Sequence, residues 1–216
     1  MEQKPRVYIT TGGTREAIDD VRYVTNFSTG KFGLAIAAEF LARGFPVTIF
    51  GSREAYREAQ VYDRAVQSAW QGCFRVEDWN RKEWEQALEQ QRKRNSFPIV
   101  PSVAPFQLLS HGEFHQFTSA KSLGDLLSNM KNGSVVFNAA AVADYTPVEV
   151  NGGKISSEAD ELVILMRRTP KLISTLREEY PNSILVGFKL LAGATDSELL
   201  EAAAEQIRSN QLDFSI

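Results

Sequence analysis

The sequence predicts an α/β fold, in which a mostly parallel sheet carries helices on both faces. Short apolar segments that are typical of buried strands alternate with longer amphipathic segments that are typical of helices. The segment 6–51 contains a complete strand–helix–strand unit, which implies parallel strands joined by a right-handed crossover. A length of 216 residues is that of a single domain with a sizeable core.

The first strand–helix–strand unit can be followed residue by residue. An apolar run at 7–9 predicts the first strand. Apolar residues at helical spacing predict a helix at 31–43, which Gly44 ends. The apolar run at 46–51 then predicts a second strand, parallel to the first.

The segment 52–113 has a different composition. It contains the chain's three tryptophans among charged and amide residues, together with Pro98, Pro101 and Pro105. Because acidic residues balance the basic ones, we interpret most of it as solvent-exposed helix and not as a nucleic-acid platform. The prolines indicate an irregular excursion over the sheet edge, which could serve as a lid or a dimer element.

Regular α/β order returns after residue 113. Strands are predicted at 114–119, 134–138, 163–166 and 184–188, with another beginning at 214, and helices at 123–130, 171–179 and 197–209.

Two glycine-bearing loops after the first strand predict a cradle for an anion. Gly12 and Gly13 lack a Cβ, so their backbone N–H groups can turn toward a ligand oxygen. The loop 26–31 should supply a Ser or Thr N-cap and the positive end of the following helix. The dinucleotide-binding fingerprint G-x-G-x-x-G is incomplete in the run that begins at Gly12. The P-loop pattern is incomplete too, because Thr25 stands in place of its first glycine and Phe32 in place of its Ser or Thr. Ordinary turn glycines therefore remain an alternative.

Charge and cysteine content exclude several classes of protein. A formal net charge of −3 gives no support for binding to nucleic acid or to a membrane. A single cysteine, Cys73, cannot form an internal disulfide, and no apolar run approaches 18 residues, so we expect a cytoplasmic protein. Since His111 and His115 lack the context of a catalytic base, we interpret Cys73 as inert.

Short motifs spaced along the chain resemble one enzyme family. They lie at 11–15, 21–23, 26–31, 139–145, 154–155, 170–171 and 187–189. Together they resemble phosphopantothenoylcysteine synthetase, the ligase that joins phosphopantothenate to cysteine in coenzyme A biosynthesis. The resemblance covers 6–50 and 115–214. It implies a three-layer, Rossmann-like fold and a single nucleotide-binding ligase domain over 1–216, with an insertion at 52–113.

The resemblance also implies a reaction. A carboxylate is a poor acylating agent because its leaving group would be oxide, so amide synthesis requires prior transfer of a phosphoryl or nucleotidyl group. The family forms an acyl-nucleotidylate with a nucleoside triphosphate and Mg²⁺, and the amine of cysteine then attacks it. CTP is our first choice of nucleotide and ATP our second. The family also implies a homodimer, in which the partner completes the phosphopantothenate site.

Two catalytic residues follow from the matching motifs. Asn26 corresponds to the asparagine that orients the substrate carboxylate and the acyl intermediate. Lys154 corresponds to the lysine that promotes formation of the acyl-nucleotidylate, in a glycine-rich loop that we expect to be flexible. On the residues alone, Asn26 could instead cap the following helix, and Lys154 could be a solvated surface charge.

The phosphate side of the nucleotide is assigned in the same way. The matching positions are Gly12, Ser28, Gly30 and Gly33. Arg167 and Arg168 occupy the second nucleotide loop of the family, although arginines are also common at surfaces.

Small residues at the end of the 134–138 strand are assigned to the nucleoside. Open α/β sheets bind ligands at the carboxyl ends of their strands, and Asn138, Ala139 and Ala140 would let a base or ribose approach the backbone. The resemblance implies that Asp144 recognises base or ribose and that Phe188 lies against the base. The alternatives are core packing for the alanines and Phe188, and a turn or N-cap role for Asp144.

The chain also departs from the family pattern. Ser156 and Ser157 replace two lysines found in one group of relatives, and Gln206 and Asn210 replace two lysines that face the triphosphate in others. We also expect a C-terminal segment of the family to be missing. The metal ligands cannot be assigned.

Two other functions remain open from the residues. A nicotinamide-dependent reductase of the short-chain type would fit the glycine turn, but none of the tyrosines has the lysine four positions later that this class needs. A nucleotide-binding regulatory module without catalysis is the other alternative.

Overall fold

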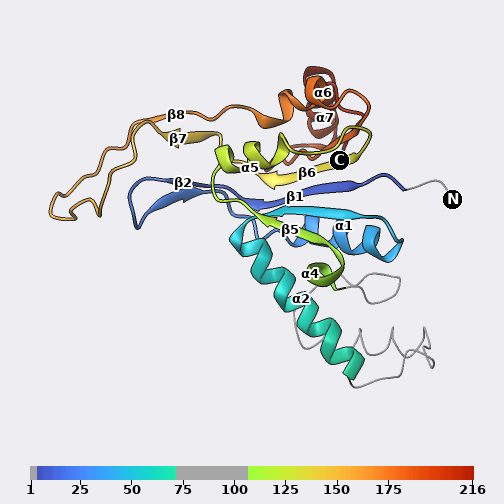
Figure 1. The fold of residues 1–216 in the computed structure, drawn as a ribbon. Coiled ribbons are helices and arrows are strands. Elements are labelled where there is room, and N and C mark those ends of the chain that lie inside the picture. The colour runs from blue at the N-terminus through green and yellow to red at the C-terminus, as the bar shows by residue number, and fades with distance from the viewer. Residues whose placement is uncertain (1–3, 72–106) are drawn as a thin grey trace.

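The computed structural model describes residues 4–71 and 107–216, and in that part the chain forms a six-stranded parallel sheet (Figure 1). The strand order is β10-β9-β6-β1-β4-β5, so β1 and β6 lie side by side at the centre. The chain runs outward from β1 in one direction and from β6 in the other, which is the doubly wound order. The strands are β1 (Val7–Gly13), β4 (Val47–Gly51), β5 (Glu113–Gln116), β6 (Val135–Ala141), β9 (Ile184–Gly187) and β10 (Phe214–Ser215).

Helices cover both faces of the sheet (Figure 1), which confirms the predicted three-layer, Rossmann-like arrangement. One face carries α1 (Lys31–Ala42), α2 (Arg53–Gln71) and α4 (Leu108–His111). The other carries α5 (Ala120–Leu127), the 3₁₀ turn η2 (Leu172–Ser174), α6 (Leu176–Glu179) and α7 (Asp196–Asn210). In the described residues, no helix combines the length and the apolar character needed to cross a membrane.

The central strand β1 is buried along its whole length. Every residue of β1 is buried, because both faces of the sheet are covered. Val7 and Ile9 pack with α1 and α2, whereas Tyr8 packs on the opposite face with α5 and α6. Side chains alternate between the faces of a strand, so one short run of residues contributes to both cores.

Helix α2 is part of the core, although we interpreted its sequence as an exposed helix. Ala55, Ala59, Tyr62 and Val66 lie on one face of the helix and are buried in the core beside α1. The segment 72–106, with Cys73 and the three prolines, lies outside the described residues. The insertion at 52–113 therefore stays a prediction.

Two antiparallel ribbons project beside the sheet (Figure 1), and neither was predicted. The ribbons are β2 (Arg15–Ala17) with β3 (Tyr23–Thr25), and β7 (Tyr145–Pro147) with β8 (Met166–Arg168). The predicted sheet strand at 163–166 is wrong: only Met166 is in a strand, and that strand pairs with β7. Val163 and Leu165 are 89% and 74% exposed, so this apolar run is not core.

Other boundaries also differ from prediction. Strands β1 and β6 continue through Gly13 and Ala141, so the glycines and alanines are strand ends and not loops. The predicted helix 171–179 is divided into η2 and α6. Within it, Ser174 Oγ donates to the carbonyl of Lys171, at 2.7 Å, and such side-chain bonds compete with helix formation.

A close approach of backbones joins β1, α1 and α2. The N-cap of α1 is Gly30, with φ of +81° and no side-chain cap, so the predicted Ser or Thr N-cap is wrong. Thr11 Oγ1 donates to the carbonyl of Gly30 at 2.7 Å. A Cβ on Gly30 would lie 2.5 Å from Ala55 Cβ, and one on Gly33 would lie 2.4 Å from Thr11 Oγ1. Both glycines are therefore required by packing.

Substitution at this junction should be costly. Gly30→Ala combines a left-handed backbone with a clash against Ala55, so it should lower the free energy of unfolding by more than the roughly 1–2 kcal/mol of the backbone term alone. Gly133→Ala is the matched control, since Gly133 has φ of +74° with no atom within 4 Å of its would-be Cβ. Urea unfolding of both variants measures the difference. Equal losses would show that the contact with Ala55 does not constrain α1.

Candidate functional site

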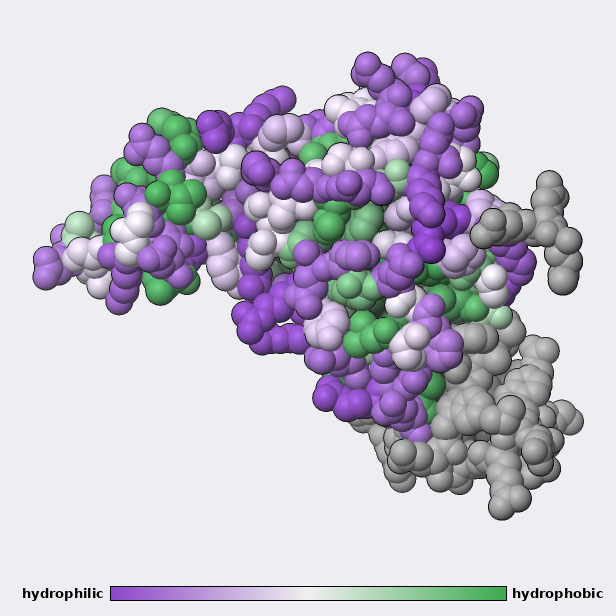
Figure 2. Space-filling view, viewed as in Figure 1, coloured by the Kyte–Doolittle hydropathy of each residue, from purple (hydrophilic) through white to green (hydrophobic). Residues whose placement is uncertain are grey.

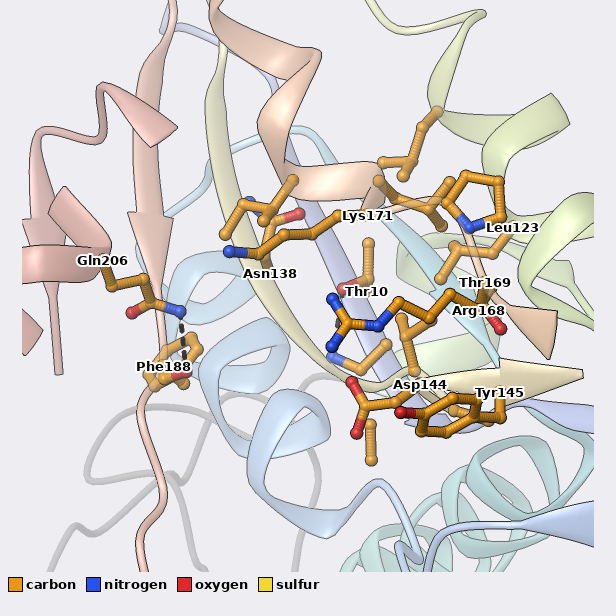
Figure 3. Close-up of a pocket in the computed structure, with 18 residues that line it drawn as sticks. Thr10, Leu123, Asn138, Asp144, Tyr145, Arg168, Thr169, Lys171, Phe188 and Gln206 are labelled. Atoms are coloured by element: carbon orange, nitrogen blue, oxygen red, sulfur yellow. Dashed lines mark hydrogen bonds between the residues drawn. The ribbon is translucent and has the colours of Figure 1, made fainter. Parts of the chain in front are cut away.

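A cavity of about 690 Å³ lies at the carboxyl ends of the central strands (Figure 3). Its walls come from the ends of β1, β6 and β9, from the loop between β8 and η2, and from α5 and α7. Strands β1 and β6 are the pair between which the strand order reverses. Open α/β sheets bind their ligands at this position.

Strand register brings distant motifs to this end of the sheet. Gly12 pairs with Ala140, and Gly13 pairs with Ala141. Gly30 also reaches this point, since a Cβ built on it would lie 3.2 Å from the N atom of Gly12. The predicted meeting of the glycine turns with the alanine run is therefore present.

Two polar side chains hold the chain as it leaves β6. Thr14 Oγ1 accepts a hydrogen bond from the N–H of Ala143 at 3.0 Å, and this bond is buried. Asn26 Nδ2 donates to the carbonyl of Val142 at 3.1 Å. Because Val142 lines the cavity, the Asn26 amide lies at its edge with its Oδ1 acceptor still available.

The residues predicted for the nucleoside side are mostly in the cavity wall. Those that line it are Asn138, Ala140, Asp144 and Phe188 (Figure 3). Ala139 belongs to the same strand but does not line the cavity. The ring of Phe188 meets that of Phe32, in the first turn of α1, edge to face at 5.1 Å. Phe188 thus connects the cavity wall to the start of α1.

The residues predicted for the phosphate side surround the start of α1. They are Gly12, Ser28, Gly30 and Gly33, and none lines the cavity. The first-turn amides of α1 have no side-chain cap, and uncapped amides at a helix N-terminus favour anions. Packing against Thr11 is sufficient to explain Gly33, so phosphate contacts by these residues remain a prediction.

Lys154 lies away from the cavity of its own chain. It is exposed, on the long connection between β7 and β8 that projects from the sheet (Figure 1). The expected flexible loop is instead bound on both sides of the lysine. The N–H groups of Gly153 and Ile155 donate to Asp20 and Asp19 at 2.8 and 3.1 Å.

Two cations extend into the cavity, one from the end of β8 and one from the loop that follows it (Figure 3). The guanidinium of Arg168 lies toward Asp144, and the ammonium of Lys171 lies toward Asn138. Neither side chain has a hydrogen bond or ion pair with another described residue. In the sequence, Lys171 was assigned only to the 170–171 motif and not to the site. Its position shortly after a strand and next to Pro170 is the signal that could have indicated a site residue.

Thr169, between these two cations, fixes the segment on which they lie. Its N–H donates to the carbonyl of Asp144 at 2.9 Å. Its Oγ1 is buried and has no partner in the part of the chain that is described. Buried hydroxyls usually have a hydrogen-bond partner, so this oxygen is available to a ligand.

Helix α7 contributes a neutral wall. Gln206 Nε2 donates to the carbonyl of Phe188 at 3.3 Å, and its Oε1 accepts from Ser215 Oγ at 2.6 Å. Asn210 is buried, with its Nδ2 donating to the carbonyl of Gln206. The Gln206 amide therefore connects α7 to the ends of β9 and β10, whereas the Asn210 amide is bonded within α7.

A second cavity, of about 1180 Å³, adjoins the first. It lies between the β2–β3 ribbon, the start of α5 and strand β8. The two cavities share Arg168, Thr169, Pro170 and Leu172 as a common wall. Arg22 and Arg167 are among the basic residues that line the second cavity.

A magnesium ion bound together with a nucleotide would fit the first cavity. Among the described residues that line it, Asp144 is the one carboxylate, and the described part of the chain holds no group of three or more His, Cys, Asp or Glu that could bind a metal by itself. Mg²⁺ is commonly held by substrate phosphates with one or two carboxylates. Asp144 is the residue that could supply such a ligand.

Comparisons with known proteins agree on one family. The family model described as the DNA/pantothenate metabolism flavoprotein C-terminal domain matches residues 2–82 and 100–216. The coenzyme A biosynthesis bifunctional protein CoaBC of Thermococcus kodakarensis is 31% identical over 211 residues, which are 98% of this chain and 40% of that protein. The phosphopantothenate–cysteine ligase of Mus musculus is 30% identical over 215 residues, covering 92% of this chain and 66% of the ligase.

A solved structure supports the same conclusion. The crystal structure of the C-terminal domain of a CoaBC protein aligns with a TM-score of 0.60 and 25% identity, over 99% of this chain and 76% of that one. The chain spans less than half of the archaeal relative's length. This chain belongs to the family of the DNA/pantothenate metabolism flavoprotein C-terminal domain.

Proposed function

We propose that the chain is a ligase that joins the carboxylate of phosphopantothenate to the amine of cysteine, using a nucleoside triphosphate. The observation that carries this proposal is the meeting of Gly12, Gly30 and Ala140 at the carboxyl end of the central strands, beside the first cavity, in a chain whose relatives include a phosphopantothenate–cysteine ligase. CTP is the first choice of nucleotide and ATP the second, with Mg²⁺. The cytoplasmic location stays a prediction.

We infer that the nucleotide occupies the first cavity. Phe188 offers an aromatic face to the base, and Asp144 can accept hydrogen bonds from ribose hydroxyls or hold Mg²⁺. The phosphates would extend toward the uncapped amides that begin at Lys31 in α1. The residue of α7 that lines the cavity, Gln206, is neutral, so Arg168 and Lys171 would supply the positive charge that balances the polyphosphate.

The adjoining cavity is the proposed site for phosphopantothenate. Arg22 and Arg167 provide positive charge for a phosphate monoester. The common wall at 168–172 would let the far end of that substrate, its carboxylate, reach the nucleotide. In this placement, the carboxylate of phosphopantothenate and the α-phosphorus of the nucleotide would meet at the wall formed by 168–172.

The reaction then proceeds in two substitutions. A carboxylate oxygen attacks the α-phosphorus, and pyrophosphate leaves. The amine of cysteine next attacks the acyl carbon, loses a proton, and displaces the nucleoside monophosphate. Asn26 would orient the carboxylate and the acyl group, because an amide can donate and accept without titrating.

A homodimer is the proposed assembly. Lys154 does not line the cavity of its own chain, and the connection that carries it projects from the sheet (Figure 1). The projecting segment also exposes apolar side chains that a partner could cover, including Val163 and Leu165. We infer that Lys154 acts in the site of a second copy.

The function is tested by incubating the wild-type protein with phosphopantothenate, cysteine, Mg²⁺ and either CTP or ATP. We expect pyrophosphate and phosphopantothenoylcysteine in equal amounts, measured by an enzyme-coupled assay and by mass spectrometry. Nucleotide binding without turnover would favour a regulatory module, and binding of a nicotinamide cofactor would favour a reductase. Either result would contradict the ligase.

Asn26 is expected to be catalytic. Asn26→Ala should fold, because its amide makes one hydrogen bond at the edge of the cavity, but ligation should be slower by at least about a hundredfold, the usual effect of removing a preorganised donor. Steady-state kinetics and a thermal unfolding curve measure the two effects. Amide formation at the wild-type rate would remove Asn26 from the mechanism.

Lys171 is expected to bind phosphate. Lys171→Met keeps the aliphatic stem and removes the charge, so the Kd for the triphosphate should rise by about tenfold while that for the corresponding monophosphate stays within about twofold. Lys131→Met is the control, since this exposed lysine does not line the cavity. Calorimetric titration supplies both constants. An equal loss for both nucleotides would place Lys171 at the nucleoside instead.

A further inference from the structure

A buried carboxylate joins two segments that are far apart in the sequence. Asp19 lies in the turn between β2 and β3, and its side chain has no exposed surface. Its Oδ1 accepts hydrogen bonds from the N–H groups of Val21 and Arg22, at 2.9 and 2.7 Å. Its Oδ2 accepts from the N–H of Ile155 at 3.1 Å. One side chain therefore fixes both the turn and the residue after Lys154.

The same turn also holds the residue before Lys154. Asp20 Oδ2 accepts from the N–H of Gly153 at 2.8 Å, and Arg22 Nη2 donates to the carbonyl of Ile155 at 2.9 Å. Gly153 has φ of +83°, a conformation that glycine adopts at little cost. The backbone on both sides of Lys154 is thus bound to the turn, while the lysine itself is exposed.

The bond to Ile155 is more than the turn itself requires. An aspartate that accepts from the two following N–H groups is sufficient to stabilise a turn of this kind. Burying the second oxygen is unfavourable unless it too is hydrogen-bonded. Burial alone would raise the pKa of Asp19, but the N–H groups of Val21, Ile155 and Arg22, with the charge of Arg22, hold that pKa below its usual value. The ionised carboxylate therefore depends on both segments.

We propose that Asp19 is a positioning residue, which holds the backbone that presents Lys154 to the phosphates of the nucleotide. This inference rests on the proposed ligase function. Asp19 belongs to the lining of the second cavity, but its side chain has no exposed surface to offer a substrate, and it acts through Lys154. A rigid support is needed because a displacement of about 1 Å in a positioned group can cost a factor of about 100 in rate.

Asp19→Asn tests this role with a side chain of nearly the same shape. Its amide oxygen can still accept from Val21 and Arg22, whereas its NH₂ group cannot accept from Ile155. We expect kcat to fall by at least about tenfold, with the Kd for the triphosphate unchanged within about twofold. Hydrogen exchange should show faster exchange of the Ile155 amide. Glu205→Gln, which changes an exposed carboxylate paired with Arg208, is the control.

A double-mutant cycle separates positioning from general stability. If Asp19 acts through Lys154, Asp19→Asn should cause no further loss of kcat in a Lys154→Ala background. Additive losses would show a structural role and overturn the inference. Unchanged exchange at Ile155 in Asp19→Asn would also overturn it.

Gly153→Ala gives an independent approach in case Asp19→Asn does not fold. It leaves the carboxylate intact, and open space surrounds its would-be Cβ, but it disfavours the backbone conformation beside Lys154. We expect the same selective fall in kcat, and wild-type kcat would contradict the proposal. If the wild-type enzyme is active but the losses of kcat in the double-mutant cycle are additive, only this inference is overturned. If the wild-type enzyme is inactive, the proposed ligase function is overturned as well.

Discussion

The fold depends on how closely the start of α1 approaches the end of β1. The hydroxyl of Thr11 holds the carbonyl of Gly30, and there is no room for a Cβ on Gly30 or Gly33. This contact fixes the direction of α1, so that its uncapped N-terminus lies beside Gly12. Because Gly12 is in register with Ala140, the positive end of the helix and the end of β6 meet at the reversal of the strand order.

The remaining features of the site are arranged around this meeting point. The segment that carries Arg168 and Lys171 forms one wall of the cavity, and α7 forms a neutral wall opposite (Figure 3). The surface is predominantly hydrophilic in the view of Figure 2, but green apolar groups gather on the projecting segment at the left. The exposed side chains there include Val150, Leu162, Val163 and Leu165. Two cations thus lie where we place the nucleotide, and apolar side chains are exposed where we place a partner.

The inner strands β1, β4 and β9 could be predicted from the sequence because they are largely buried and contain short apolar runs. The amphipathic helix α1 was predicted for a related reason, since its apolar residues recur at helical spacing. The two ribbons could not be predicted, because three-residue strands leave almost no periodic signal. The run at 163–166 was misassigned since apolar residues on a projecting segment look like core. The hydrogen bonds from Gly153 and Ile155, on either side of Lys154, to Asp20 and Asp19 join residues more than 130 positions apart. No local sequence pattern indicates such a contact.

In the proposed enzyme, the cavity at the end of β1 and β6 binds the nucleotide with its phosphates toward α1. A crystal structure of the protein with CTP and Mg²⁺ tests this placement most directly. We expect the base against Phe188 and the triphosphate within hydrogen-bonding distance of the first amides of α1. A triphosphate bound away from α1, or a nucleotide bound outside this cavity, would contradict it.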